Sequence, residues 1–199
     1  MADSVLLALD FANTVSWRLT LQPKEKLTGV ADLASWARRT GILSTQQARR
    51  LSVRSPVRTA SLMKRAFRLR ESIYRIFAAA ASRRRPRVRD LALLNQAVRN
   101  ASARLELAPG RGPLAWRWID PAALDYVLWP IARSAAELLT SPEVSRVRVC
   151  AGAGCGWLFL DRSRNHTRRW CDMSDCGNRE KARRHYRRVR QNKRRKNTR

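Results

Sequence analysis

The clearest hydrophobic pattern in the chain lies between Val57 and Ala81. Apolar residues recur there at steps of three and four, with no proline or glycine between them. The positions that form this stripe are Leu62, Ala66, Leu69, Ile73, Ile76 and Phe77. Such a period is typical of an amphipathic helix. The sequence therefore predicts one long helix that is buried along a single face.

Shorter segments predict further helices on both sides of the long one. We expect them at residues 32–41, 44–51, 91–101 and 121–140. Ser44 and Asp90 are suitable N-caps, and Asp120 followed by Pro121 is a typical helix start. The opening residues 5–14 are too short and mixed to separate a buried helical turn from a strand.

Two other regions alternate between apolar and polar residues. Residues 104–107 and 114–118 flank a Pro-Gly-Arg-Gly-Pro segment, which predicts a β-hairpin. Residues 147–149 and 157–160 also resemble strands. The first 140 residues thus predict a mainly helical region with a small β element.

Four cysteines are gathered near the C-terminal end, with the spacing Cys150-x4-Cys155-x15-Cys171-x4-Cys176. Two close pairs separated by such a spacer fit a tetrahedral four-thiolate zinc site. The small residues at 151–154 allow the tight turn that brings two sulfurs to one ion. Iron remains open from spacing alone, although a small hairpin-and-helix unit favours zinc. Buried thiols or two disulfides are the alternative, which a reducing compartment disfavours.

The second cysteine pair is followed by a predicted helix, for which Ser174 or Asp175 is the expected cap. A knuckle followed by a helix that supplies the last ligand is the treble-clef arrangement. The fold class is therefore α+β and mainly helical, an N-terminal helical domain with a small β-hairpin followed by a treble-clef-like zinc finger. The expected division is 1–142 for the first domain, 143–190 for the finger and 191–199 for a disordered basic tail.

Charge changes the functional picture more than the fold. Lys and Arg number 42 against 15 Asp and Glu, a formal net charge of +27. Such an excess draws a protein to polyanions, namely DNA, RNA or an anionic membrane surface. The basic residues are densest after Val144.

The helix after Cys176 carries much of this charge. Its narrow apolar face of Ala182, Tyr186 and Val189 is expected to pack against Trp157 and Phe159, while the other faces are basic and suit phosphate contact. The expected nucleic-acid contacts are Arg162, Arg164, Arg168, Arg169, Arg179, Arg183, Arg184, Arg187 and Arg188.

Several classes of protein are disfavoured by what the sequence contains. Asp10 interrupts the first apolar run, so no secretory signal is expected. No segment approaches 20 uninterrupted apolar residues, which argues against a membrane span and for a cytoplasmic protein. His166 and His185 are the only histidines, and both lie in the basic module. Four thiolates leave zinc no open position for water, so catalytic residues are not expected.

The residues around the cysteines carry a family resemblance. Cys155-Gly156-Trp157 continuing to Asn165, Arg169 to Met173, and Cys176-Gly177-Asn178-Arg179 resemble the CGNR zinc finger. Leu9-Asp10-Phe11-Ala12-Asn13-Thr14 resembles the N-terminal motif of the ABATE domain. The resemblance implies a bacterial transcription regulator, proposed to be stress-related, with Zn²⁺ on the four cysteines. The basic tail after Arg190 departs from this pattern.

Three functional hypotheses follow from these observations. The first is a DNA-binding regulator whose zinc site positions the basic helix. The second is an RNA-binding or ribosome-associated module, in which Trp157, Trp170 and Tyr186 would stack on bases. The third is a sensor, in which a small-molecule effector binds near Asp10, Asn13 and Trp17. A homodimer is also expected, because one small finger buries little DNA surface.

Overall fold

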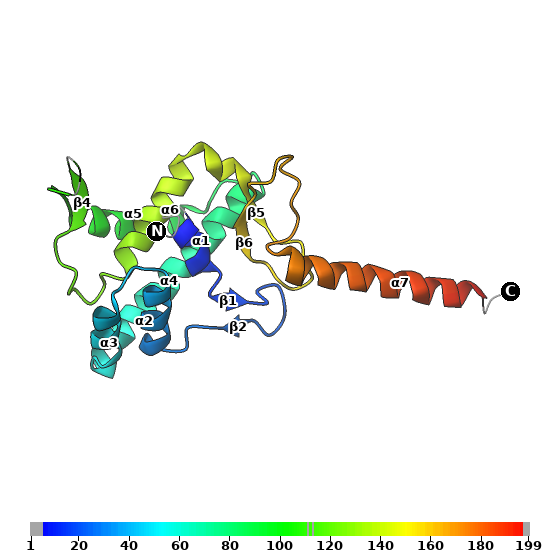
Figure 1. Ribbon diagram of the computed structural model, residues 1–199, viewed down its shortest axis with the longest axis horizontal. Helices are drawn as coiled ribbons and strands as arrows, with labels where there is room; N and C mark the ends of the chain where they lie inside the picture. Colours follow the sequence, from blue (N-terminus) through cyan, green and yellow to red (C-terminus); the bar gives the residue numbers. More distant parts are fainter. Residues whose placement is uncertain (1–5, 111, 113, 197–199) are drawn as a thin grey trace.

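The computed structural model describes residues 6–110, 112 and 114–196, and is shown in Figure 1. A helical body occupies one side of the molecule, and a single helix leaves it at the C-terminal end. The helices of the body are α1 (Leu7–Ala12), α2 (Val30–Arg39), α3 (Thr45–Ser52), α4 (Pro56–Ala81), α5 (Val88–Ser102) and α6 (Leu128–Thr140). The opening segment, which the sequence left ambiguous, is helical.

The long helix α4 organises the body, as its apolar stripe predicts. Leu62, Ile73 and Phe77 are fully or almost fully buried, and α1, α5 and α6 pack around them. Burial of each such side chain contributes about 1.5–3 kcal/mol relative to exposure. Pro56 occupies the first turn, where its missing N–H costs nothing. The helix ends where Arg83 adopts a left-handed backbone conformation, φ 54°.

The last helix of the body begins later than predicted. Asp120 and Pro121 do not open α6, and residues 120–127 form turns before the helix starts at Leu128. The physical reason is Pro130. A helix that started at Pro121 would place Pro130 in its interior, where it lacks an N–H and clashes with the preceding turn. With the observed start, Pro130 lies in the first turn and is tolerated.

Two predicted caps have different outcomes. Ser44 caps α3 through a capping box with Gln47, as expected. Asp90 does not cap α5, because that helix begins at Val88, with Arg87 at the N-cap position. Asp90 is instead buried in the first turn and accepts hydrogen bonds from Arg75 at 2.6 and 3.0 Å.

The described strands form three antiparallel two-stranded hairpins. They are β1 (Val15–Ser16) with β2 (Lys24–Glu25), β3 (Leu105–Ala108) with β4 (Ala115–Trp118), and β5 (Val147–Val149) with β6 (Leu158–Leu160). The second and third hairpins confirm the two alternating regions. The short helix η2 (Pro142–Arg146) links α6 to β5, and α4 packs against both η2 and β5.

The C-terminal helix α7 (Asn178–Lys196) follows a π-helical turn, η3 (Met173–Gly177). It projects away from the body (Figure 1). It also extends through residues 191–196, where the sequence predicted disorder. The reason is that Gln, Lys and Arg are good helix formers, and this segment has no glycine or proline to end the helix. Residues 197–199 of the predicted tail lie outside the described residues.

No helix in the described part of the chain is both long and apolar enough to cross a membrane.

Candidate zinc site and basic helix

The first cysteine pair lies on the β5–β6 hairpin. Cys150 follows β5 directly, and its amide donates to the Trp157 carbonyl at 2.7 Å. The chain then turns so that the Cys155 amide reaches the Gly152 carbonyl at 3.0 Å. A side chain at Gly152 would meet the sulfurs of Cys150 and Cys176 at 3.4 and 3.2 Å. Glycine at this position therefore leaves room for the cysteine cluster.

The second pair is set by the turn that precedes α7. The Asp172 carboxylate accepts from the amides of Ser174 and Asp175 at 2.6 and 3.0 Å, so Asp172 is the cap. The predicted caps, Ser174 and Asp175, are the donors instead. Both lie inside the turn that Asp172 caps, because η3 begins at Met173, before Cys176. This π-helical turn brings Cys176 inward, where it is 1% exposed.

The four cysteine sulfurs all lie within 4.8 Å of one another. The Cys171 sulfur is 3.7 Å from the sulfur of Cys155 and 3.7 Å from that of Cys176. A tetrahedral zinc ion with Zn–S bonds of ~2.3 Å requires sulfurs about 3.8 Å apart. The cluster therefore fits Zn²⁺. Backbone amides of Gly152 and Cys171 donate to the Cys150 sulfur at 3.4 and 3.3 Å, which fixes its position in the cluster.

The thiols have divergent acidities because they share one small space. A hydrogen bond from Cys171 lowers the pKa of Cys155 to about 5. The same hydrogen bond raises the pKa of Cys171, and burial raises the pKa of Cys176 to about 11. Four neighbouring thiolates repel one another unless a cation lies among them. Zinc would supply that charge, and the four cysteines would form a closed structural site.

Arg179 connects the cluster to the body of the protein. Its guanidinium donates to the Cys176 sulfur at 3.0 Å, pairs with Asp175 at 3.2 Å and lies 4.4 Å from the centre of the Trp17 ring. The first turn of α7 is thereby fixed to an N-terminal residue. Arg179 was predicted to contact nucleic acid, and the structure gives its side chain three partners within the protein.

The N-terminal segment contacts the β5–β6 hairpin and its turn (residues 147–160), which we call the knuckle, mainly through backbone hydrogen bonds. Arg18 and Leu19 donate their amides to the carbonyls of Cys155 and Gly154, both at 3.1 Å. The Asn13 side chain accepts from the Leu158 amide at 2.9 Å and donates to the Leu158 carbonyl at 2.8 Å. In this way a side chain pairs with β6 as a neighbouring strand would.

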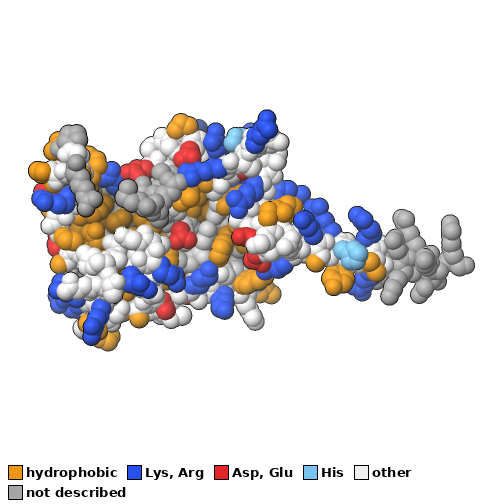
Figure 2. Space-filling model, in the orientation of Figure 1, with side chains coloured by type: hydrophobic (Ala, Val, Ile, Leu, Met, Phe, Trp, Pro, Cys, Tyr) orange, Lys and Arg blue, Asp and Glu red, His pale blue; other side chains and the backbone are white. Residues whose placement is uncertain are grey.

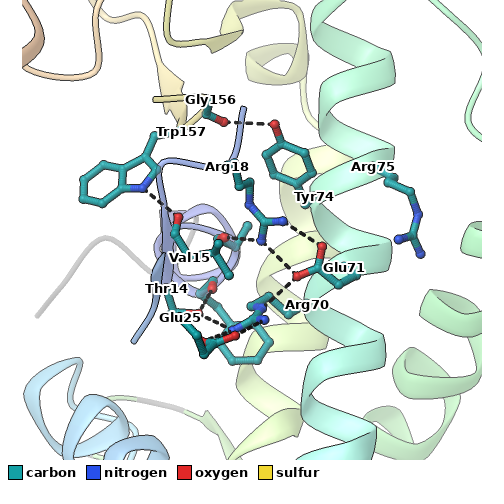
Figure 3. Close-up of polar contacts among 12 residues, drawn as sticks. Thr14, Val15, Arg18, Glu25, Arg70, Glu71, Tyr74, Arg75, Gly156 and Trp157 are labelled. Carbon is teal, nitrogen blue, oxygen red and sulfur yellow. Dashed lines mark hydrogen bonds and ion pairs between the residues drawn. The ribbon is translucent and has the colours of Figure 1, made fainter. Parts of the chain in front are cut away.

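Two more hydrogen bonds complete this interface between the body and the knuckle, which we call the joint, as Figure 3 shows. The Trp157 indole donates to the Val15 carbonyl at 2.9 Å, and the Tyr74 hydroxyl of α4 donates to the Gly156 carbonyl at 3.0 Å. Together with the backbone bonds, they join the knuckle to two separate parts of the helical body.

A chain of ion pairs underlies this joint (Figure 3). Arg18 pairs with Glu71 at 2.7 Å, and Arg70 bridges Glu71 and Glu25 at 3.0 and 2.6 Å. Arg70 also donates to the Thr14 hydroxyl at 3.2 Å. Burial alone would raise the pKa of Glu71, but the two arginines outweigh it and hold that pKa below its usual range.

The apolar face of α7 does not pack as predicted. Tyr186 and Val189 are 72% and 40% exposed. Their expected neighbours have other partners, since Lys26 lies over the Trp157 ring at 4.3 Å and Phe159 is buried beside the cysteines. Every side chain from Lys181 to Gln191 is exposed, because the η3 turn directs α7 away from the body.

The predicted contact arginines of α7 beyond Arg179 divide into two groups, those that pair with a carboxylate and those that do not. Arg183 and Arg184 on α7 share Glu180, at 2.7 and 3.7 Å. No hydrogen bond or ion pair joins the side chains of Arg187 or Arg188 to another described residue. Along with Arg184, these two lie on the helix face opposite Tyr186 and Val189, by helical periodicity. Figure 2 shows the basic side chains that continue from the body onto this helix.

The arginines of the loop before Cys171 have mixed roles. Arg162 pairs with Glu143 at 3.4 Å, and the Arg169 guanidinium lies 5.6 Å from the Trp170 ring. Arg168 donates to the carbonyls of Trp170 and Cys171, so it holds the loop. Arg164 is the exception, because it has no ion pair among the residues described.

Asp161 is a structural residue that the sequence analysis missed. It is fully buried and accepts from the amides of Ser163 and Arg168, both at 3.0 Å, and from the Ser163 hydroxyl at 2.6 Å. Burial would raise its pKa, but these hydrogen bonds outweigh that effect and lower it. The available signal was local: an acidic residue followed two positions later by serine is typical of an Asx turn.

A polar cavity of about 410 Å³ lies beside the joint. Asp10 and Asn13 line it, together with Lys26, Arg39 and Trp157. Trp17, the third residue of the predicted effector site, is not among the lining residues and lies against Gly154 and Arg179 instead. The structure thus brings together two of those three residues.

A helical body joined to a C-terminal hairpin-and-helix unit with four clustered cysteines defines a class of structural zinc-finger proteins. Residues 6–142 match the ABATE family, described as "Putative stress-induced transcription regulator", and residues 146–189 match the CGNR zinc finger. The chain belongs to the ABATE family. No curated protein matches the chain. The resemblance predicted from the two motifs is therefore confirmed, and the family is one of transcription regulators rather than of enzymes.

Proposed function

We propose that this protein is a zinc-dependent transcription regulator that binds DNA through α7 and has no catalytic activity. The observation that carries the proposal is the helix itself. It is anchored at its first turn by the hydrogen bond from Arg179 to Cys176, and its described side chains from Lys181 onward are exposed and mainly basic. A helix about 28 Å long by its rise per residue fits the major groove of duplex DNA.

The charge distribution along α7 supports DNA contact. Glu180 is its only acidic residue, and it lies in the first turn, where it pairs with Arg183 and Arg184. Beyond that turn the helix is cationic, with Arg187 and Arg188 free to meet phosphates. Such contacts give affinity that depends strongly on salt. Sequence selectivity would require base contacts by the same face.

RNA binding remains the alternative, and one observation weighs against it. Stacking on bases was predicted for Trp157, Trp170 and Tyr186, but only Tyr186 is exposed. Trp157 already holds Lys26 on its ring and the Val15 carbonyl on its nitrogen. These three side chains therefore do not form a shared exposed platform for unpaired bases.

The test is a salt series of binding to duplex DNA with the full-length, zinc-loaded protein. Arg187→Gln with Arg188→Gln should lower affinity at least tenfold and reduce the log–log salt slope by about 1.8 if both contact phosphates. Arg49→Gln with Arg50→Gln, on α3 of the body, is the matched control. An α7 variant indistinguishable from the control would refute the proposal, and preference for a structured RNA competitor would favour the alternative.

The cavity beside the joint favours a second role, control of the finger by a small anion. Lys26 and Arg39 line the cavity together with Asp10 and Asp32, and neither cation is hydrogen-bonded or ion-paired to a carboxylate among the described residues. Desolvation lowers the pKa of Lys26, and nearby Asp10 only partly restores it. An anion bound there would touch Trp157 and so contact the knuckle directly.

Thermal unfolding with inorganic phosphate or acetate tests this second role. Either anion at 100 times its Kd should stabilise the protein by about 2.7 kcal/mol, a rise of a few degrees in Tm. Lys26→Gln should abolish the rise, whereas Arg38→Gln, which lies outside the cavity, should retain it. The absence of any rise in the unmodified protein would contradict anion binding.

The predicted homodimer needs a separate test. Sedimentation of the same samples measures the molecular mass in solution and so distinguishes a monomer from a dimer.

A further inference from the structure

The segment between α4 and α5 concentrates basic residues that the proposed function does not use. Five arginines occur within seven positions, and all five are exposed. They are Arg83, Arg84, Arg85, Arg87 and Arg89. No hydrogen bond or ion pair links any of their side chains to a carboxylate in the described chain. The nearest acidic residue, Asp90, is buried and held by Arg75 at 2.6 Å.

Three other arginines of the body differ from these five. Arg18, Arg70 and Arg75 each pair with a carboxylate at 2.6 or 2.7 Å. The body thus pairs several of its cations individually with carboxylates, whereas none of these five forms an ion pair among the described residues. Neighbouring like charges repel one another, which costs free energy in the isolated protein and is relieved by a polyanion.

The backbone of the segment is firmly held. The amides of Arg83 and Arg84 donate to the carbonyls of Ala80 and Ala79 at 2.9 and 2.8 Å, which closes the end of α4. The Arg87 carbonyl accepts from the amides of Asp90 and Leu91 at the start of α5. The guanidinium groups therefore project from a fixed loop, and little backbone entropy is lost when they bind.

The segment lies on the side of the body that carries the finger. The end of α4 reaches β5 (Figure 1), and α4 packs against η2 and β5. The finger loop is attached to the same element, because Arg162 pairs with Glu143 of η2. Arg146 of η2 is also exposed. The helix that precedes segment 83–89 and the finger loop thus both contact η2.

We propose that the segment 83–89 is a second DNA contact, which binds backbone phosphates next to the site occupied by α7. This inference rests on the proposed function, since it requires that α7 bind the same duplex. The loop would add affinity without reading sequence, because phosphate contacts position a protein and base contacts specify its site.

The test uses the full-length zinc-loaded protein and a 30-base-pair duplex. The loop variant combines Arg83→Asn, Arg84→Gln and Arg85→Gln, with asparagine chosen because it tolerates the left-handed backbone. It should bind at least tenfold more weakly at low salt and reduce the log–log slope by up to about 2.7. The control combines Arg49→Gln, Arg50→Gln and Arg54→Gln and should change affinity less than twofold. Thermal melting confirms that both fold.

Hydroxyl-radical footprinting separates the two contacts. Loss of the loop should shorten the protected tract at one edge, whereas Arg187→Gln with Arg188→Gln should remove its centre. A loop variant that matches the control in slope and footprint would overturn this inference and leave the proposed function intact. If the α7 variant retains the centre of the footprint, the proposed function fails. Weakened binding to structured RNA alone would overturn the assignment to DNA.

Discussion

The helical body and the zinc finger are stabilised in different ways. The body has a continuous apolar core built from α1, α2, α4 and α6, with Phe77 and Ile131 fully buried. The finger's hairpin adds Val147, Leu158 and Leu160 to that core. The cluster around the cysteines contains Cys150, Cys155, Cys176 and only one other buried residue, Phe159. So small a core cannot offset the chain entropy lost on folding. We therefore expect the cysteine-bearing part of the finger to depend on metal and the helical body to stay folded without it.

Arginine shows the same contrast at the level of one residue type. Arg70 is 4% exposed and neutralised by Glu25 and Glu71, so it is part of the framework. Arg188 is exposed and has no such partner among the described residues. One side chain stabilises the fold, and the other is available to an anion. A charged side chain is therefore available to bind a partner only where the fold leaves it unpaired.

The largest expected effect comes from removing the metal. Chelation, or Cys176→Ser, should unfold the finger and leave the body folded, because metal binding supplies about 10 kcal/mol to such modules. Hydrogen exchange should show loss of protection at residues 150–176 and retention in α4. The amides of Arg18 and Leu19 should lose protection with the finger, since their acceptors are in the knuckle. Simultaneous loss in α4 would contradict separate stabilisation.

The contrast between Arg70 and Arg188 provides the next test. Arg70→Ala should destabilise the protein by about 3 kcal/mol, because it leaves Glu25 and Glu71 without their shared partner. Arg188→Ala should change stability by less than about 0.5 kcal/mol. Urea unfolding measures both. Equal effects would show that the distinction between framework and free arginines is wrong.

The joint between the regions is tested at Gly154, whose φ is +75°. Gly154→Ala should cost about 1–3 kcal/mol, because alanine disfavours this backbone and its Cβ would lie 2.6 Å from the Thr20 methyl. Thr20→Ser removes that methyl and keeps the hydroxyl, so the double variant should recover part of the loss. Thermal melting measures the recovery. Complete absence of rescue would place the whole effect in the backbone.

The smallest expected effect is a pH dependence of the body's free energy of unfolding. A hydrogen bond from Arg75 lowers the pKa of Asp90 relative to its usual value. A carboxyl with a depressed pKa stabilises the fold above its unfolded pKa, about 3.9, and this contribution is lost as pH falls through the folded value. The stability difference between the unmodified protein and Asp90→Asn should be full at pH 6 and shrink below pH 4. A constant difference would rule out this role.

Local patterns of the sequence determined the elements and the metal site. A 3.6-residue period specifies α4, and two close cysteine pairs specify a four-sulfur cluster, because both depend on residues near one another in the chain. The start of α6 was also decided locally, by Pro130, although the Asp-Pro pair before it indicated an earlier start. The division at 142/143 stays a prediction, since residues of the N-terminal region bond directly to the knuckle.

Only the tertiary structure decided which polar residues are used within the protein and which are left exposed. Arg179 and Arg187 look alike in sequence, yet Trp17 and Cys176 engage the first and leave the second free. Asn13 bonds to Leu158, 145 positions away. Tyr186 and Val189 form an apolar stripe that remains exposed. Periodicity specifies the face of a helix, but the turn at η3 sets its direction, and that direction determines what each face can meet.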